Sequence, residues 1–219
     1  MIDAPFFPFQ SLARDLLQHL PEDNGDGSHD LSHIHRVWIN ARAIQKIEGG
    51  DLETLLAATL LHDCVAVEKN SPLRAKASTL SADKAASILA GLGWSESKVL
   101  AVAHAVKTHS FSAGFEPTTL EAKILQDSDR LDAIGMVGVA RCFYIAGRMG
   151  SALYDFTNPL ALDREYQDKR FAIEHFHTKL LKLAYGFQTQ EGARIAAKRH
   201  ESLEHFVKEF MAEIGSPEC

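Results

Sequence analysis

Adjacent histidine and aspartate residues at the end of an apolar segment are the first feature of this sequence that could do chemistry. In "LETLLAATLLHD", residues 52–63, a run of Leu, Ala and Thr precedes His62 and Asp63. Burying an ionised carboxylate costs several kcal/mol or more unless it is paired with a cation. The segment therefore indicates either a metal site or a buried ion pair with Lys69 or Arg36.

A second His-Asp dipeptide, His29-Asp30, begins the segment "HDLSHIHRVW". Because it follows the turn-rich "NGDGS", we expect Asp30 to cap a helix that begins there. On that helix His33 shares a face with Arg36, whereas His35 points elsewhere. His33 and His35 therefore cannot both face one site from a regular helix.

Three carboxylates interrupt an apolar helical pattern in "AKILQDSDRLDAIGMVGVAR", residues 122–141. Helical spacing places Asp129 and Asp132 on one face and aligns Asp127 with Arg130. Repulsion between close carboxylates is relieved by a bound cation or by arginine side chains. The residues of this segment leave an ion-paired helix and a metal site both open.

Taken in order, His33, His62-Asp63 and Asp129 resemble the H…HD…D signature of the HD-domain metal-dependent phosphohydrolases. The surrounding segments are also similar to the small stand-alone bacterial subgroup of that family: "SHDxxHxxRVW", "NSPLR", "HSFS" and "QDSDRLDAIG". The resemblance covers residues 28–150, and it implies that residues 151–219 form a C-terminal helical extension. It also implies an all-α HD-domain fold with a single domain over residues 1–219.

The resemblance implies one divalent metal ion held by four side chains: His33, His62, Asp63 and Asp129. Two imidazoles and two carboxylates suit Mn²⁺, Fe²⁺, Co²⁺, Ni²⁺ or Mg²⁺ better than a closed structural zinc site. A bound cation lowers the pKa of its water and can coordinate a phosphoryl oxygen.

Substrate phosphates are expected to meet cationic side chains near the metal. The loop "VAVEKNSPLRAK", residues 65–76, supplies Lys69 and Arg74, although a solvated surface loop would carry the same charges. Glu68 is expected to orient or deprotonate the attacking water, or else to pair with Lys69. The predicted catalytic residues are Asp63, Glu68, Lys69 and His109. The predicted substrate contacts are Arg36, Lys69, Arg74, His109 and Arg130, with the first and last of these acting mainly as braces for carboxylates.

His104 and His109 raise the alternative of a second metal ion. Five positions apart on a regular helix, they differ by about 140° and cannot converge. They could converge only if the helix ended near Thr108. We therefore expect one metal ion, with His109 reaching the site from a loop.

Composition favours a globular, cytoplasmic protein. The 219 residues are 46% hydrophobic and carry a net charge of −6, which argues against binding to nucleic acid polymers or acidic membranes. The three cysteines have no metal-finger spacing, and the first residues lack the basic region of a secretion signal. An apolar N-terminal arm hints at a homo-oligomer.

Helical periodicity dominates, and no alternating strand pattern occurs. We expect Asp51, Ser81 and Ser95 to cap helices that follow them. The expected helices cover about residues 9–20, 29–48, 52–63, 82–93, 96–109, 119–147, 163–187 and 190–213.

The predicted function is metal-dependent hydrolysis of a phosphate ester or phosphoanhydride, with a nucleotide or (d)NTP as substrate. Two alternatives stay open at this point. One is a nucleotide-sensing module that keeps the fold without turnover, and the other is a dinuclear iron oxygenase on the same scaffold.

Overall fold

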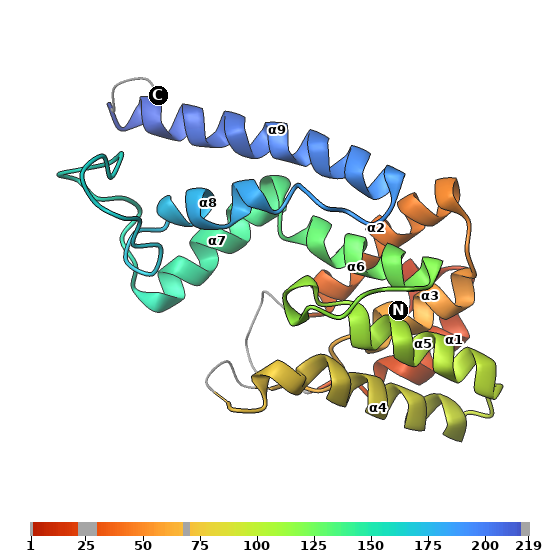
Figure 1. Cartoon of the computed structure of the whole chain (residues 1–219). Coiled ribbons are helices and arrows are strands. Elements are labelled where there is room, and N and C mark those ends of the chain that lie inside the picture. The colour runs from red at the N-terminus through yellow and green to blue at the C-terminus, as the bar shows by residue number, and fades with distance from the viewer. Residues whose placement is uncertain (1, 22–29, 68–70, 216–219) are drawn as a thin grey trace. The chain divides into compact units, whose positions relative to one another are not determined.

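The computed structural model describes residues 2–21, 30–67 and 71–215, and within them the protein is built from helices (Figure 1). This described part contains no strand, only an isolated bridge between Ala152 and Phe171. The all-α prediction is therefore confirmed. The α-helices are α1 (Gln10–Leu17), α2 (Leu31–Glu48), α3 (Leu52–Leu61), α4 (Ala77–Gly91), α5 (Glu96–Thr108), α6 (Leu120–Asp132), α7 (Gly135–Met149), α8 (Glu174–Thr178) and α9 (Gln190–Glu213).

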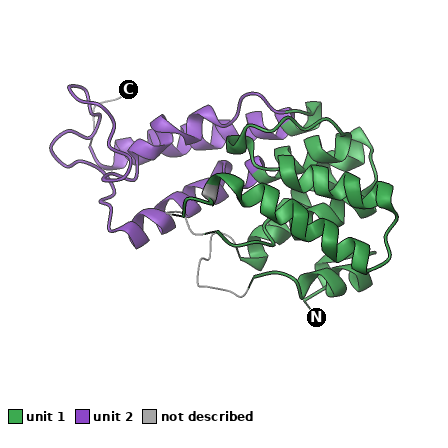
Figure 2. Ribbon diagram, turned by 60° about the horizontal axis from the view of Figure 1, so that its bottom comes forward, with its two compact units in different colours: residues 1–129, 188–192 green, residues 130–187, 193–219 purple. Residues whose placement is uncertain are grey.

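The chain divides into two compact units, which Figure 2 distinguishes by colour. Unit 1 contains residues 1–129 together with the short returning segment 188–192. Unit 2 contains residues 130–187 and 193–219. The prediction of one domain over the whole chain stays a prediction.

Helix α3 forms the centre of unit 1. Every residue from Thr54 to Leu61 is buried, and α3 contacts α1, α2, α4 and α5. A helix that is apolar on all sides must be surrounded by other elements, which explains this position. The end of α3 therefore places His62 in the interior of unit 1, and Asp63 follows it with its side chain half-buried.

Aspartate caps start the two helices that lead into the site, as predicted. The Asp51 carboxylate accepts from the backbone N–H groups of Glu53 and Thr54 at the start of α3. The Asp30 carboxylate accepts from the His33 N–H at 3.0 Å. Each cap satisfies helix donors that lack an intrahelical partner, and so fixes where the helix begins.

Ser81 does not cap α4, contrary to prediction. Helix α4 already begins at Ala77, and Ser81 lies buried inside it. The Ser81 hydroxyl instead accepts from the backbone N–H of Val65 at 3.3 Å. The prediction was wrong because the partner of this serine lies in another segment.

The prediction of one long helix over residues 119–147 is also wrong, because the chain forms two helices there, α6 and α7. Gly135 has a φ of +74°, a left-handed conformation that L side chains rarely adopt. A Cβ atom at this position would lie 3.1 Å from the Arg199 Cγ. Glycine thus permits both the turn and the close approach of the Arg199 side chain.

The helix predicted over residues 163–187 is mostly absent. Only α8 and a short 3₁₀ turn, Leu180–Lys182, are helical there. The Arg164 guanidinium donates to Asp155 at 2.9 Å and to Glu174 at 2.6 Å, and the Gln167 N–H donates to Glu174. These side-chain bonds hold the segment in a loop that competes with helical backbone bonding.

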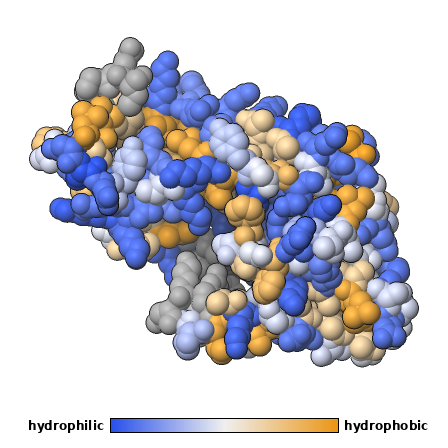
Figure 3. Space-filling view, viewed as in Figure 1, coloured by the Kyte–Doolittle hydropathy of each residue, from blue (hydrophilic) through white to orange (hydrophobic). Residues whose placement is uncertain are grey.

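Hydrophobic and hydrophilic residues are interspersed on the face drawn in Figure 3. Among the described residues, no helix combines the length and the apolar character that crossing a membrane would require.

Candidate metal centre

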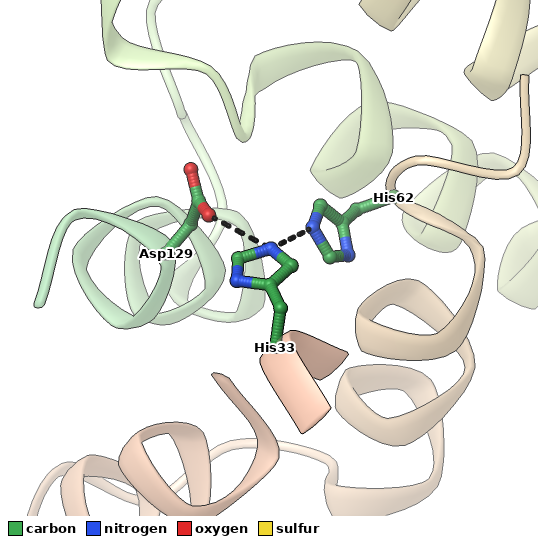
Figure 4. Close-up of side chains that lie close together, drawn as sticks. All are labelled: His33, His62 and Asp129. Atoms are coloured by element: carbon green, nitrogen blue, oxygen red, sulfur yellow. Dashed lines mark hydrogen bonds and ion pairs between the residues drawn. The ribbon is translucent and has the colours of Figure 1, made fainter. Parts of the chain in front are cut away.

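Three side chains from three helices of unit 1 converge in the interior. His33 comes from α2, His62 follows the last residue of α3, and Asp129 comes from α6 (Figure 4). The His33 Nε2 lies 3.2 Å from the His62 Nε2 and 3.5 Å from the Asp129 Oδ1. The structure thus brings together three of the four predicted ligands.

The spacing of the two imidazole nitrogens fits a shared ion. Two nitrogens bound at about 2.0–2.1 Å to one cation, at angles of about 90–110°, are separated by about 2.8–3.4 Å. The 3.2 Å between His33 and His62 falls in this range. The donor set, which is two nitrogens and a carboxylate oxygen, also fits a divalent transition metal.

The protonation of His62 favours ligation. Its Nδ1 lies 2.7 Å from the Thr59 carbonyl oxygen, which can only accept, so Nδ1 carries the proton. Complete burial lowers the pKa of His62, and the attraction of Asp63 only partly offsets this effect. The ring is therefore neutral at pH 7, with the lone pair of Nε2 directed at His33.

Asp63 approaches the same nitrogen of His62 as His33 does. Its Oδ2 is 3.6 Å from the His62 Nε2, and its Oδ1 is 3.6 Å from the His109 Nε2. Two overlapping groups could therefore hold a metal ion, His33-His62-Asp129 and His62-Asp63-His109, and His62 belongs to both. Burial opposes ionisation of Asp63, but His62 and His109 hold the pKa of this carboxyl well below its usual range.

His109 reaches the site because α5 ends one residue before it. Its Nδ1 donates to the Val106 carbonyl oxygen at 2.6 Å, and its ring meets that of His62 edge-on at 4.9 Å. Burial disfavours the charged ring, yet the Asp63 carboxylate at 3.6 Å, with the charge of Asp129 adding to its effect, raises the pKa of His109 to about 9. Without a cation at the site, His109 is thus an imidazolium paired with Asp63.

His104 is occupied elsewhere. Its Nε2 accepts from the backbone N–H of Thr118 at 3.1 Å and lies 3.0 Å from the Thr118 hydroxyl. It belongs to neither of the two groups found among the described residues. The helix ends near Thr108, as convergence would require, but His104 remains with the loop before α6.

Exposure differs between the histidines and the carboxylates of the site. The side chains of His33 and His62 are at most 2% exposed, whereas those of Asp129 and Asp63 are 28% and 43% exposed. The imidazoles therefore form a buried base, and solvent reaches the carboxylates.

The three aspartates of α6 have three different partners. The Asp127 carboxylate accepts from the backbone N–H of Gln188 and from both the N–H and the hydroxyl of Thr189. The Asp132 carboxylate accepts from Arg141 at 2.7 Å. Only Asp129 faces the histidines, so α6 is an ion-paired helix and a contributor to the candidate metal site at once.

Arg130 packs a loop of unit 2. Its guanidinium donates to the carbonyl oxygens of Leu183, Tyr185 and Gly186 and lies over the Phe187 ring. With 5% of the residue exposed, this arginine is committed to backbone groups. Its predicted roles, as a brace for a carboxylate and as a substrate contact, stay predictions.

The structure describes the other predicted site residues only in part. Arg36 donates to the Ser32 hydroxyl of its own helix at 2.8 Å. Glu68 and Lys69 lie outside the described residues, as does the side chain of Arg74. Their predicted roles stay predictions.

Comparison with known proteins agrees with this arrangement. The HD domain model matches residues 30–134. The uncharacterized protein YpgQ of Bacillus subtilis (strain 168) is 32% identical over 205 residues, which cover 92% of this chain and 91% of YpgQ. The chain therefore belongs to the HD-domain family.

Within that family the similarity extends over nearly the whole chain. The crystal structure of Bacillus subtilis YpgQ in complex with ADP superposes on this chain with a TM-score of 0.71 and 30% sequence identity. The match covers 92% of this chain and 97% of the YpgQ chain. An HD-superfamily hydrolase from Bacillus thuringiensis is 28% identical, with a TM-score of 0.72 and coverage of 95% and 99%. The chain is a small YpgQ-like member of the HD superfamily.

Proposed function

We propose that this protein is a metal-dependent phosphohydrolase that acts on a phosphate ester or phosphoanhydride of a nucleotide. The observation that carries the proposal is the convergence of the His33 and His62 Nε2 atoms at 3.2 Å, with the Asp129 carboxylate beside them. Two buried imidazoles and a carboxylate with solvent access are suited to holding a cation at the end of a binding site.

The proposed ligands of one divalent ion are His33, His62, Asp63 and Asp129. Nitrogen and carboxylate donors favour Mn²⁺, Fe²⁺, Co²⁺ or Ni²⁺, and Mg²⁺ is compatible with the carboxylates. When bound, such a cation acidifies water and polarises a phosphoryl oxygen.

The side chains around the ligands supply the remaining functions. Asp63, which is half exposed and ionised, can orient water, and Glu68 is proposed for the same task. As an imidazolium, His109 can donate a hydrogen bond from Nε2 to a phosphate oxygen while its Nδ1 donates to the Val106 carbonyl oxygen. Phosphate binding by Lys69, Arg74 and Arg36 completes the proposed site.

A nucleotide is the proposed substrate class for two reasons. YpgQ, to which this chain is similar over most of its length, has been crystallised with ADP. The chain itself carries a net charge of −6, so its overall field does not attract polyanions. A small phosphorylated molecule that meets a few local cations fits this charge better than a nucleic acid polymer.

Elemental analysis of the purified protein, followed by a nucleotide hydrolysis panel with added Mn²⁺, tests the proposal. We expect about one equivalent of metal per chain, and we expect turnover to be lost in His33→Ala and Asp129→Ala. His104→Ala is the matched control, because His104 bonds to Thr118 instead of the cluster, and it should retain activity. A metal-loaded protein that hydrolyses no member of the panel would favour a sensing module, and two equivalents of iron would favour the oxygenase.

A further inference from the structure

A buried amide joins the helix that carries His33 to the helix that carries Asp129. The Asn40 Nδ2 donates to the carbonyl oxygen of Ser128 at 3.0 Å, and only 4% of Asn40 is exposed. Ser128 is the residue directly before Asp129. The hydrogen bond therefore attaches α2 to the backbone of α6 beside the candidate ligand.

Asn40 and His33 lie on the same face of α2. Their separation of seven residues is about two helical turns, which returns a side chain to nearly the same direction. His33 contacts the Asp129 side chain, and Asn40 contacts the Ser128 backbone. The two contacts together fix both the position of α2 along α6 and its rotation.

A directional contact is needed here because apolar packing alone leaves some freedom to slide. Burial of apolar surface is non-directional, whereas a buried N–H group that loses its acceptor costs free energy. Metal sites need their ligands within about 0.5 Å of the productive geometry. A hydrogen bond from α2 to the residue before Asp129 supplies this restriction where the two ligands meet.

We infer that Asn40 is a positioning residue, which sets the metal affinity of the site by fixing α2 against α6. The inference rests on the proposed function, since it concerns the metal that His33 and Asp129 would share. No sequence motif singles out Asn40. Its seven-residue spacing from His33 is the one signal in the sequence.

The test is the dissociation constant of Mn²⁺, measured by isothermal titration calorimetry on the full-length protein. Asn40→Leu keeps the number and branching of side-chain atoms but removes the donor. We expect the Kd to rise about tenfold, the lower end of the effect of residues that support metal ligands. Nucleotide hydrolysis by Asn40→Leu should recover when Mn²⁺ is raised about tenfold, a recovery that His33→Ala should not show.

Ile44→Val is the matched control. Ile44 is fully buried on the same face of α2, one turn beyond Asn40, so this variant loosens packing without removing a hydrogen bond. Its Kd for Mn²⁺ should equal that of the unsubstituted protein. If Asn40→Leu does not fold, Asn40→Ser makes the same comparison, because its hydroxyl is too short to span the contact.

The outcomes separate the two proposals. An unsubstituted protein that binds no divalent metal overturns the proposed function and this inference with it. Metal binding by the unsubstituted protein with an equal Kd in the Asn40 variant overturns the inference alone. A similar loss of affinity in Ile44→Val also overturns it, because the effect would then be general loosening of α2.

Discussion

Replacing Gly192 with alanine should destabilise this protein, although helix propensity alone predicts the opposite. Gly192 lies in the first turn of α9, and alanine in place of glycine within a helix contributes roughly 1 kcal/mol of stability. A Cβ atom at Gly192 would lie 2.5 Å from the Asp127 Oδ2 and 2.6 Å from the Thr189 Oγ1. Both distances are well below van der Waals contact, so one of the neighbours must move.

Neither neighbour can move freely. The Thr189 hydroxyl donates to Asp127 at 2.7 Å and accepts from the Gly192 N–H at 3.0 Å. Overpacking costs about 1–3 kcal/mol, and loss of one hydrogen bond to a charged group costs about 1.5–3 kcal/mol. The two costs add, and after subtraction of the propensity gain of about 1 kcal/mol we expect Gly192→Ala to lower the free energy of unfolding by roughly 1.5–5 kcal/mol.

Urea denaturation followed by circular dichroism measures this change. Gly147→Ala is the control, because Gly147 lies in α7 with no atom within 4 Å of its Cβ position. It should be neutral or should raise stability by up to about 1 kcal/mol. A Gly192→Ala protein as stable as the Gly147→Ala protein would refute the reasoning. In an Asp127→Ala background, the cost of Gly192→Ala should fall, because the closest contact is then absent.

Three further predictions concern the site and the thiols. The Gln126 amide donates at 2.8 Å to the carbonyl oxygen of Thr108, the residue before His109, and so helps to position His109. Gln126→Met should therefore lower kcat about tenfold with little change in Mn²⁺ affinity, as steady-state kinetics would show. Mn²⁺ at 100 times its Kd should raise the free energy of unfolding by about 2.7 kcal/mol, seen as a higher melting temperature that EDTA reverses. Burial raises the pKa of the Cys64 thiol and, with Asp168 adding to the effect, that of the Cys142 thiol to about 11. Since the reactive thiolates form only well above neutral pH, iodoacetamide at pH 8 should modify both cysteines only after unfolding in urea, as peptide mass spectrometry would show.

The helices could be predicted from the sequence where the residues that determine them lie close together in the chain. The apolar run of residues 54–61 lies next to its aspartate cap and next to His62, so the central helix and its functional end could both be predicted. Asp30 likewise caps the helix that carries His33 within three residues. Local signals therefore gave the helices that bring the candidate ligands together.

The predicted helices fail where side chains form contacts that the helical pattern does not contain. Gly135, at the break between α6 and α7, lies against the Arg199 side chain, and the loop that replaces the expected helix over residues 163–187 is held by Arg164 bridging Asp155 and Glu174. Arg164 lies 9 residues from Asp155 and 10 residues from Glu174, so the three- and four-residue spacing of a helix does not reveal these contacts. The competing side-chain bonds decide the outcome around Arg164.

Helix α6 shows why the site could be predicted only in part. Its carboxylates were recognisably unusual in an apolar helix, but their tasks are set by their partners. Asp127 and Asp129 have partners about 60 to 100 residues away in the chain, and Asp132 is paired with Arg141, 9 residues further on. Asp127 holds the start of α9, while Asp129, two residues later, points to His33. Because successive positions on a helix face different directions, one short segment can anchor the returning chain and supply a metal ligand without the two tasks competing. The fixed geometry of α6 then makes the anchoring of residues 188–192 and the placement of Asp129 properties of the same rigid element, so a change at Asp127 should reach the candidate metal site through the helix itself.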